Sequence, residues 1–268
     1  MKKSLLLLIL LVVFACKEKK EEVIDLTPRE VVNTEDEVKE EVELTQYPKE
    51  ENKVLDVIIP MYYDKEVHAS EIAKMNDKWL SFYDRNGLYK VVPAKFEISE
   101  KVNECNDTDM LGVFSPEALE PLFFLGPNPM IKQGVKDAMA VNKAPLWPSQ
   151  NQEYLFNGKK YTLRAEGIET RSYNYTDDSG KEQKYKEFMK YKLYLSVGTD
   201  EQLILDIPEF NDKFITLLFV GDLDGDGNLD FVFDTSSDYE EKTVEVYLSR
   251  GAKHLIYLAG LVSVDFSC

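Results

Sequence analysis

The densest group of potential metal ligands is the segment GDLDGDGNLDF, which runs from Gly221 to Phe231. Calcium takes about six to eight oxygen ligands from carboxylates, backbone carbonyls and water, and alternate residues of a tight loop can point inward at one ion. Gly227 stands where the chain must turn sharply, and glycine accepts a positive φ without steric cost. We therefore expect a Ca²⁺ site, with a solvated Asp-Gly turn without metal as the alternative. The expected ligands are Asp222, Asp224, Asp226, Asn228 (through its backbone carbonyl) and Asp230.

The apolar segments FITLLFV and FVFDT on either side of this loop predict that it joins two strands. An EF-hand would need flanking helices and a bidentate glutamate at the position that Phe233 occupies here. The segment instead resembles the calcium loops of the FG-GAP and VCBS repeat families, which link two strands with the same aspartate spacing. The resemblance covers Phe214 to Cys268. We expect a structural ion that holds two strands together, because a loop that supplies five or more ligands leaves little room for an open coordination position. A catalytic or ligand-bridging ion is the alternative.

Outside this loop the sequence shows no recognisable catalytic arrangement. Neither His68 nor His254 lies in a zinc-protease, serine-hydrolase or phosphate-loop motif, so we expect a protein that is not an enzyme. The alternative is a hydrolase of envelope or extracellular polymers, which would use two carboxylates about 5–9 Å apart in a cleft. A second acidic group, which could complete the calcium shell or form a solvated turn, comprises Asp234, Asp238, Glu240 and Glu241.

The net charge of −17 limits the possible partners. Nucleic-acid binding needs clustered Lys and Arg to displace counterions, so this class of partner is excluded, as is direct adsorption to anionic lipid headgroups. A protein or glycan partner remains possible through a group of tyrosines near an expected long hairpin. Ordinary packing within strands is the other interpretation of these residues. They are Tyr173, Tyr175, Tyr185, Tyr191 and Tyr194.

The N-terminus predicts export and a membrane anchor. A basic start is followed by SLLLLILLVVFA, from Ser4 to Ala15, which is too short to span a hydrocarbon core about 30 Å thick and fits a signal peptide over residues 1–15. The residues Val13 to Cys16 resemble a bacterial lipobox, which implies lipidation of Cys16; an ordinary signal with an incidental cysteine is the alternative. CKEKKEE resembles the export signals of surface lipoproteins in the Bacteroidetes group. We expect an outer-membrane lipoprotein that faces either the cell surface or the periplasm.

The remaining cysteines then form an even pair. Cys105 and Cys268 would lie in an oxidising compartment, where disulfides form and persist. We expect a disulfide between them, because it would tie down the end of the chain; two separate buried thiols are the alternative. The end of the chain also resembles the ends of uncharacterised secreted bacterial proteins that finish in cysteine, and this resemblance implies no activity.

The rest of the chain divides by composition. Residues 16–53 contain thirteen acidic and seven basic residues and too few apolar ones for a core, which predicts a flexible acidic tether. Residues 54–150 are expected to form a helix and strands, and residues 151–268 an antiparallel β region with the calcium loop. The expected fold class is therefore β-rich α+β, a mainly antiparallel sandwich or meander with a small N-terminal helical part. A partial β-propeller is the alternative.

Local patterns refine this expectation. Apolar spacing predicts a helix from Ser70 to Tyr83, preceded by a strand at VLDVIIP and followed by an extended segment from Leu88. Pro121 in LEPLFFLG, with Pro127 directly after the segment, argues against a central strand there. Asn157-Gly158 suits a two-residue hairpin turn, after which Tyr161, Leu163 and Ala165 alternate with polar residues as in a half-buried strand.

Overall fold

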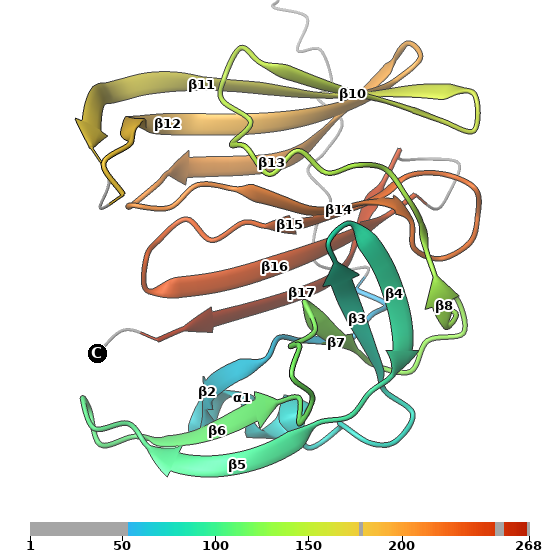
Figure 1. Ribbon diagram of the computed structural model, residues 1–268, viewed down its shortest axis with the longest axis vertical. Helices are drawn as coiled ribbons and strands as arrows, with labels where there is room; N and C mark the ends of the chain where they lie inside the picture. Colours follow the sequence, from blue (N-terminus) through green and yellow to red (C-terminus); the bar gives the residue numbers. More distant parts are fainter. Residues whose placement is uncertain (1–52, 177–178, 250–254, 267–268) are drawn as a thin grey trace, which may run out of the picture. The chain divides into compact units, whose positions relative to one another are not determined.

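The computed structural model describes residues 53–176, 179–249 and 255–266. These residues form four sheets with antiparallel pairing and one α-helix (Figure 1). The expected fold class, β-rich and mainly antiparallel with a small helical part, is confirmed. The signal peptide, Cys16, the tether up to residue 52, His254 and Cys268 lie outside the described residues. Lipidation of Cys16 and pairing of Cys105 with Cys268 therefore stay predictions.

The second half of the chain forms two consecutive meanders, each of four strands. The first meander is the sheet β10-β11-β12-β13, and the second is the sheet β14-β15-β16-β17, to which the short β9 adds at the edge of β14. The strands expected on both sides of the aspartate loop are therefore present. Their bounds are β9 Asp137–Ala138, β10 Asn151–Phe156, β11 Lys159–Thr176, β12 Glu182–Val197, β13 Asp200–Glu209, β14 Thr216–Asp222, β15 Asp230–Asp234, β16 Glu241–Leu248 and β17 Tyr257–Asp265.

The first half of the chain forms two smaller sheets and the helix. One sheet has the order β1-β7-β3-β4-β8 and the other the order β2-β6-β5, so both bring together strands from separated segments. No helix among the described residues is long and apolar enough to cross a membrane. The bounds are β1 Val57–Ile58, β2 Met61–Asp64, α1 Lys65–Ile72, β3 Leu80–Arg85, β4 Leu88–Pro93, β5 Glu97–Val102, β6 Asp109–Phe114, β7 Phe123–Leu125 and β8 Gly134–Val135.

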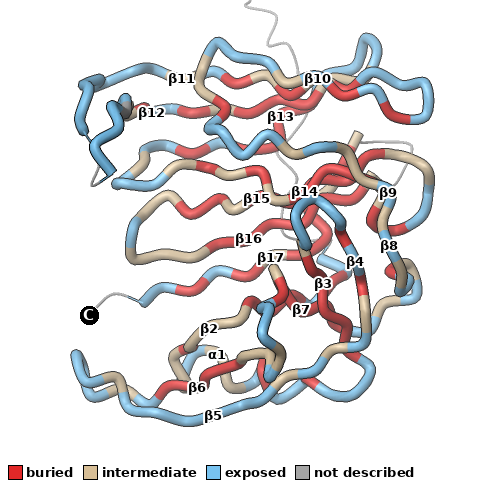
Figure 2. Tube along the Cα trace, in the orientation of Figure 1, coloured by how far each residue is buried: buried red, intermediate tan, exposed pale blue. Residues whose placement is uncertain are grey.

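The sheet β14–β17 has buried residues on both faces. In β15 the side chains of Phe231 and Phe233 pack with residues of β10–β13, whereas Val232 between them packs with residues of β1, β3 and β7. Successive side chains of a strand point to opposite faces, so one sheet contributes to both cores. Figure 2 shows the corresponding run of buried residues along β15, β16 and β17. Both cores therefore contain residues of the segments 54–150 and 151–268, and Leu146 is the buried residue of the first segment in the core with β10–β13.

The helix expected from Ser70 to Tyr83 is wrong. Helix α1 begins earlier, because the Asp64 carboxylate accepts hydrogen bonds from the backbone N–H groups of Glu66 and Val67, and it ends at Ile72. The apolar residues Trp79 and Phe82, which had suggested helical spacing, lie before and within strand β3. Phe82 pairs with β4 on one side and β7 on the other, and the burial of its side chain on the sheet overrides the local spacing.

The exclusion of a central strand from LEPLFFLG is also wrong. Residues Phe123–Leu125 form β7, which lies between β1 and β3. Pro121 precedes the strand and Pro127 follows it, so neither proline removes a ladder hydrogen bond from the strand itself. The prolines mark the two ends of a short, fully buried strand.

The two Asn-Gly turns are hairpin turns. Asn157-Gly158 joins β10 to β11, as expected, and Asn86-Gly87 joins β3 to β4. All four residues have positive φ, between 48° and 88°. This conformation gives a two-residue loop the twist of its flanking strands.

Glu245 in β16 is a buried carboxyl whose shifted pKa predicts how the stability of the protein changes with pH. Burial raises the pKa of its carboxyl, and the hydrogen bond donated by the Tyr247 hydroxyl offsets this only in part. A carboxyl with a higher pKa in the folded chain contributes stability below the unfolded pKa and loses it as the pH rises through the folded pKa. We predict that Glu245→Gln raises the melting temperature at neutral pH, with about 2–4 °C for each kcal/mol gained.

The gain from Glu245→Gln should shrink as the pH falls towards the ordinary glutamate pKa of about 4.3. Thermal melting followed by circular dichroism over a range of pH would measure it. Glu97→Gln, at an exposed position of β5, is the matched control and should give no such pH-dependent gain. A lower melting temperature for Glu245→Gln at neutral pH would contradict the prediction.

Candidate metal centre

The aspartate loop is organised by hydrogen bonds from its own backbone. Asp222 ends β14, and its Oδ1 accepts from the N–H groups of Gly225 (2.7 Å) and Asp226 (3.1 Å) while its Oδ2 accepts from Gly227 (2.9 Å). Gly225 and Gly227 have φ values of 83° and 84°, a conformation that other residues rarely adopt. The carboxylate at the start of the loop therefore fixes the turn that follows it.

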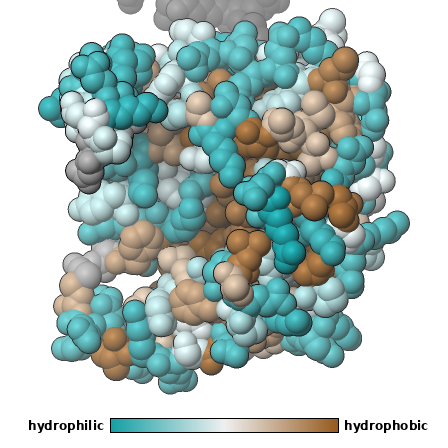
Figure 3. All heavy atoms as spheres, viewed as in Figure 1, coloured by the Kyte–Doolittle hydropathy of each residue, from teal (hydrophilic) through white to brown (hydrophobic). Residues whose placement is uncertain are grey.

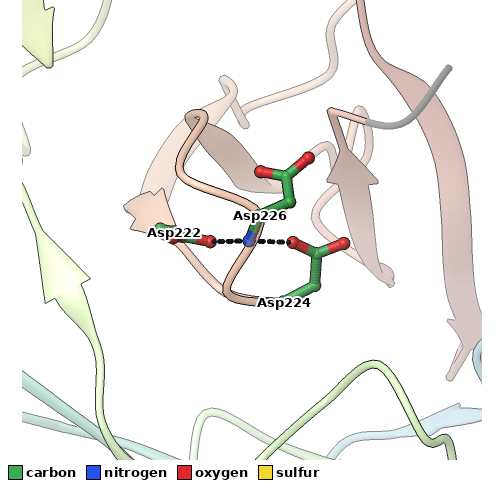
Figure 4. Close-up of side chains that lie close together, drawn as sticks. All are labelled: Asp222, Asp224 and Asp226. Atoms are coloured by element: carbon green, nitrogen blue, oxygen red, sulfur yellow. Dashed lines mark hydrogen bonds between the residues drawn. The ribbon is translucent and has the colours of Figure 1, made fainter. Parts of the chain in front are cut away.

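Three of the predicted ligands come together. Carboxylate oxygens of Asp222, Asp224 and Asp226 all lie within 4.8 Å of one another. Figure 4 shows the carboxylates of Asp222 and Asp224 on opposite sides of the Asp226 backbone nitrogen, from which each accepts a hydrogen bond of 3.1 Å. Asp224 is buried, whereas Asp226 is exposed. The donor set consists of oxygen atoms alone, which fits Ca²⁺ and lacks the nitrogen or sulfur ligands that zinc prefers.

Asp230 does not belong to this group of three. It is fully buried at the start of β15, where its Oδ2 accepts from the N–H of Leu223 (2.7 Å) and its Oδ1 from the N–H of Ser249 (2.8 Å). Burial and then the charge of Asp224 raise the pKa of the Asp230 carboxyl to about 8, against the lowering effect of the two N–H groups. A cation bound nearby would favour the ionised form. The observed role of Asp230 is to tie the loop to the residue that follows β16.

The turn between β10 and β11 makes hydrogen bonds with the second half of the aspartate loop. The side-chain amide of Asn157 donates to the backbone carbonyl of Gly227 (2.9 Å), and Lys159 Nζ donates to the Asn228 side-chain oxygen (2.5 Å). The predicted ligand Asn228 is thus held through its side chain, which leaves its backbone carbonyl for the predicted role. Sequence reasoning missed Asn157 and Lys159 as partners of the loop, because the turn motif indicates only a hairpin.

A lysine from the first half of the chain also lies near the aspartates. Burial lowers the pKa of Lys136, and the charges of Asp222, Asp224 and Asp230 act against that lowering. Lys136 stands between β8 and β9, and β9 pairs with the end of β14. Gly221 permits this pairing, since a Cβ there would lie only 2.4 Å from the backbone oxygen of Asp137. No local sequence signal linked this lysine to the loop.

The other candidate residues take structural positions. His68 lies edge-on to the Tyr63 ring, with centroids 5.2 Å apart, and its Nδ1 is 3.2 Å from Glu71. The second acidic group divides: Asp234 contacts Lys242, whereas the other three residues line a pocket with a volume of about 400 Å³. That pocket is lined by Asp238, Glu240, Glu241, Ser263 and Asp265.

The five candidate tyrosines separate into two kinds. Tyr191 is fully buried and donates to the Leu146 carbonyl, and Tyr194 is nearly buried beneath the Arg164 guanidinium. Ordinary packing accounts for these two. Tyr173 and Tyr175 are exposed, and Tyr185 is half-buried beside Tyr173. Only the last three could contact a partner.

The hydrogen bond from Asn157 to the loop gives a direct test. We predict that Asn157→Gly lowers the free energy of unfolding by about 1 kcal/mol, because glycine keeps the positive φ but removes the donor to Gly227. Urea denaturation would measure the change. Asn86→Gly alters the equivalent residue of the β3–β4 turn and should have a smaller effect. Equal effects of the two substitutions would show that the contact with the loop contributes nothing.

Comparisons with known proteins assign no family to the chain. No family model, no curated protein and no solved structure matches it. The resemblance to FG-GAP and VCBS loops therefore depends on the aspartate segment itself and stays a prediction.

Proposed function

We propose that this chain is a lipid-anchored protein of the cell envelope, in which Ca²⁺ stabilises a β-rich region that serves binding or assembly. The observation that carries the proposal is the approach of the Asp222, Asp224 and Asp226 carboxylates to within 4.8 Å at a turn between β14 and β15. The anchor rests on the N-terminal sequence, in which Cys16 ends a lipobox-like segment.

The energetics favour a structural ion. Two unit charges 4 Å apart interact by about 1–4 kcal/mol at the dielectric constants of water and of a protein surface, so three adjacent carboxylates repel one another strongly. A divalent cation converts this repulsion into attraction. An ion that binds only the folded chain adds stability in proportion to the logarithm of its concentration, about 2.7 kcal/mol at one hundred times Kd. The loop joins β14 and β15, two strands of the sheet that contributes to both cores. An ion bound in the loop would therefore stabilise the packing of both cores.

A carboxylate hydrolase has less support. Such an enzyme needs one carboxyl with a raised pKa to act as the acid. In the acidic pocket near β17, the pKa of Asp238 is lowered by the backbone N–H of Glu240 and by Asn211, and Glu241 accepts hydrogen bonds from Ser237 and Ser263. Burial raises the pKa of the Asp230 and Glu245 carboxyls, and neither residue lines this pocket. Binding or assembly is therefore the function that we propose.

Calcium removal tests the structural role. We expect EDTA to lower the melting temperature of the protein and added Ca²⁺ to restore it, by about 5–10 °C at saturating calcium. Asp226→Asn should abolish this response, because it removes a ligand charge at an exposed position and keeps nearly the same shape. Asp224→Ala should do the same with a larger loss of stability, since Asp224 is buried.

Asp77→Ala is the matched control, as Asp77 is an exposed aspartate remote in sequence from the loop. It should leave the calcium response intact. Isothermal titration with CaCl₂ would confirm that the thermal effect reflects binding. A melting curve of the unaltered protein that is the same with EDTA and with Ca²⁺ would contradict the proposal of a structural Ca²⁺ ion.

The anchor has its own test. We expect Cys16→Ser to move the protein from the membrane fraction to the soluble fraction, because a lipid chain contributes about 0.8 kcal/mol per buried CH₂ and serine cannot carry it. Metabolic labelling with a palmitate analogue should mark the unaltered protein and leave the variant unlabelled. Membrane association of the variant at the level of the original protein would refute the lipid anchor.

A further inference from the structure

The hairpin β11–β12 extends beyond the rest of its sheet. Strand β10 pairs with β11 only as far as Arg164, and β13 pairs with β12 only from Met189 onward. The segments 169–176 and 182–188 therefore pair only with each other within the ladder; we call them the ribbon. Figure 2 shows its outer part as exposed. Isolated two-stranded hairpins are marginally stable in water, and among the described side chains of the ribbon only Phe188 at its base is buried, so core packing does not explain the length of its outer part.

One face of the ribbon carries a row of aromatic rings. Tyr173 stands directly opposite Tyr185 in the ladder, and their ring centroids are 4.9 Å apart with the planes tilted by 35°. Tyr175 lies on the same face, two residues further along β11, with its centroid 6.4 Å from that of Tyr173. Tyr173 is 43% exposed and Tyr175 is 46% exposed. The three rings form a tyrosine platform.

The platform is held in place before any ligand binds. The Tyr185 hydroxyl donates a 2.8 Å hydrogen bond to Asp212, which lies between β13 and β14. The Arg171 guanidinium lies 5.0 Å from the centroid of the Tyr173 ring, and this cation–π contact restricts the second ring. A surface whose side chains are already ordered loses less conformational entropy on binding.

The charged groups beside the rings make contacts within the protein. Arg171 stands opposite Glu187, and its guanidinium nitrogen is 3.5 Å from the Glu187 carboxylate. The carboxylate of Asp212 accepts from Tyr185. A ligand that lies along the rings therefore meets aromatic faces and hydroxyl groups rather than a field of one sign. This arrangement favours an uncharged ligand, and it differs from the positively charged grooves in which aromatic residues bind nucleic acid.

The size of the platform argues for a narrow ligand. A tyrosine buries about 150–250 Å² when fully covered, so the exposed parts of Tyr173 and Tyr175 offer on the order of 200 Å². A stable protein interface needs about 800 Å² on each partner. On the face that Figure 3 shows, the outer end of the β11–β12 hairpin is coloured mainly as hydrophilic, and no broad apolar patch is seen there.

We infer that the tyrosine platform binds a neutral linear oligosaccharide, whose sugar rings stack on Tyr173 and Tyr175. Sugar rings have apolar C–H faces that match exposed aromatic rings, and their hydroxyl groups stay in water at the rim. This inference gives the proposed binding role a surface and a ligand class, and it rests on that role. It does not depend on the calcium loop.

The test is calorimetric titration of the full protein with cellohexaose, maltohexaose and laminarihexaose, with an oligogalacturonate as the charged comparison. We expect at least one neutral sugar to bind. Tyr173→Ala and Tyr175→Ala should each weaken that binding by about tenfold, as the loss of one stacking contact does. Tyr173→Phe keeps the ring and should bind within about twofold of the original protein. Tyr239→Ala removes an exposed tyrosine elsewhere and should not change binding.

The outcomes separate this inference from the calcium proposal. The alanine variants lie on an exposed face and should keep the calcium-dependent melting temperature, so lost binding would not reflect unfolding. The inference is overturned if no neutral sugar binds, if only the charged sugar binds, or if Tyr173→Ala binds like the original protein. Tyrosine-dependent dimerisation in sedimentation, without sugar binding, would assign the face to a second copy and overturn it too. If the protein binds sugar but its melting temperature does not respond to calcium, the sugar-binding inference stands and the calcium proposal fails.

Discussion

The burial of the β14–β17 sheet on both faces is the constraint on which the rest of the structure depends. Phe231, Phe233 and Tyr247 fill the core shared with β10–β13, while Val232, Val244 and Val246 fill the core shared with the first half of the chain. A fully buried apolar side chain contributes about 1.5–3 kcal/mol. A change of register by one residue would exchange the two sets of side chains, so packing on both faces fixes the register of these strands.

The pairing of strands in this sheet determines the position of the aspartate loop. Because β14 and β15 are held in register, Asp222 and Asp230 stand at fixed places at the two ends of the loop, and Asp230 pairs with Gly221, the neighbour of Asp222. Backbone N–H groups of the loop then orient Asp222 and Asp224, and Asn157 fixes the carbonyl of Gly227. A site whose ligands are oriented beforehand loses less entropy when an ion binds. The order of the loop therefore comes from the fold as well as from the aspartates.

The sequence predicted the local features that depend on short-range chemistry. The alternation of Tyr161, Leu163 and Ala165 and the Asn157-Gly158 turn appear as expected, since period-two burial and positive φ are encoded by neighbouring residues. The strands around the aspartate loop and the proximity of its first three carboxylates were predicted for the same reason.

Features that depend on distant partners were not predicted. The spacing of Trp79 and Phe82 fits a helix as well as it fits residues that pack in a sheet, and only the pairing of β3 with β7 decides between them. Phe123–Leu125 is central because β1 and β3 lie on its two sides, which its flanking prolines do not reveal. Sheet pairing brings Lys136 near the aspartates and Lys159 to the Asn228 side chain, and Asp230 accepts from the N–H of Ser249, the residue after β16. Such contacts have no local signature.

Strand β11 runs from beside the aspartate loop to the ribbon, and its length separates the two. It starts at Lys159 beside the loop and ends at Thr176, and at about 3.3 Å per residue Lys159 and Tyr173 are separated by on the order of 45 Å along the strand. The ladder with β12 is interrupted between Glu166 and Ile168 and again between Glu169 and Arg171. Bulges bend a strand and disrupt its ladder locally. Both interruptions lie between Lys159 and Tyr173, so the part of β11 that pairs with β10 and the part that forms the ribbon are joined through bulged backbone.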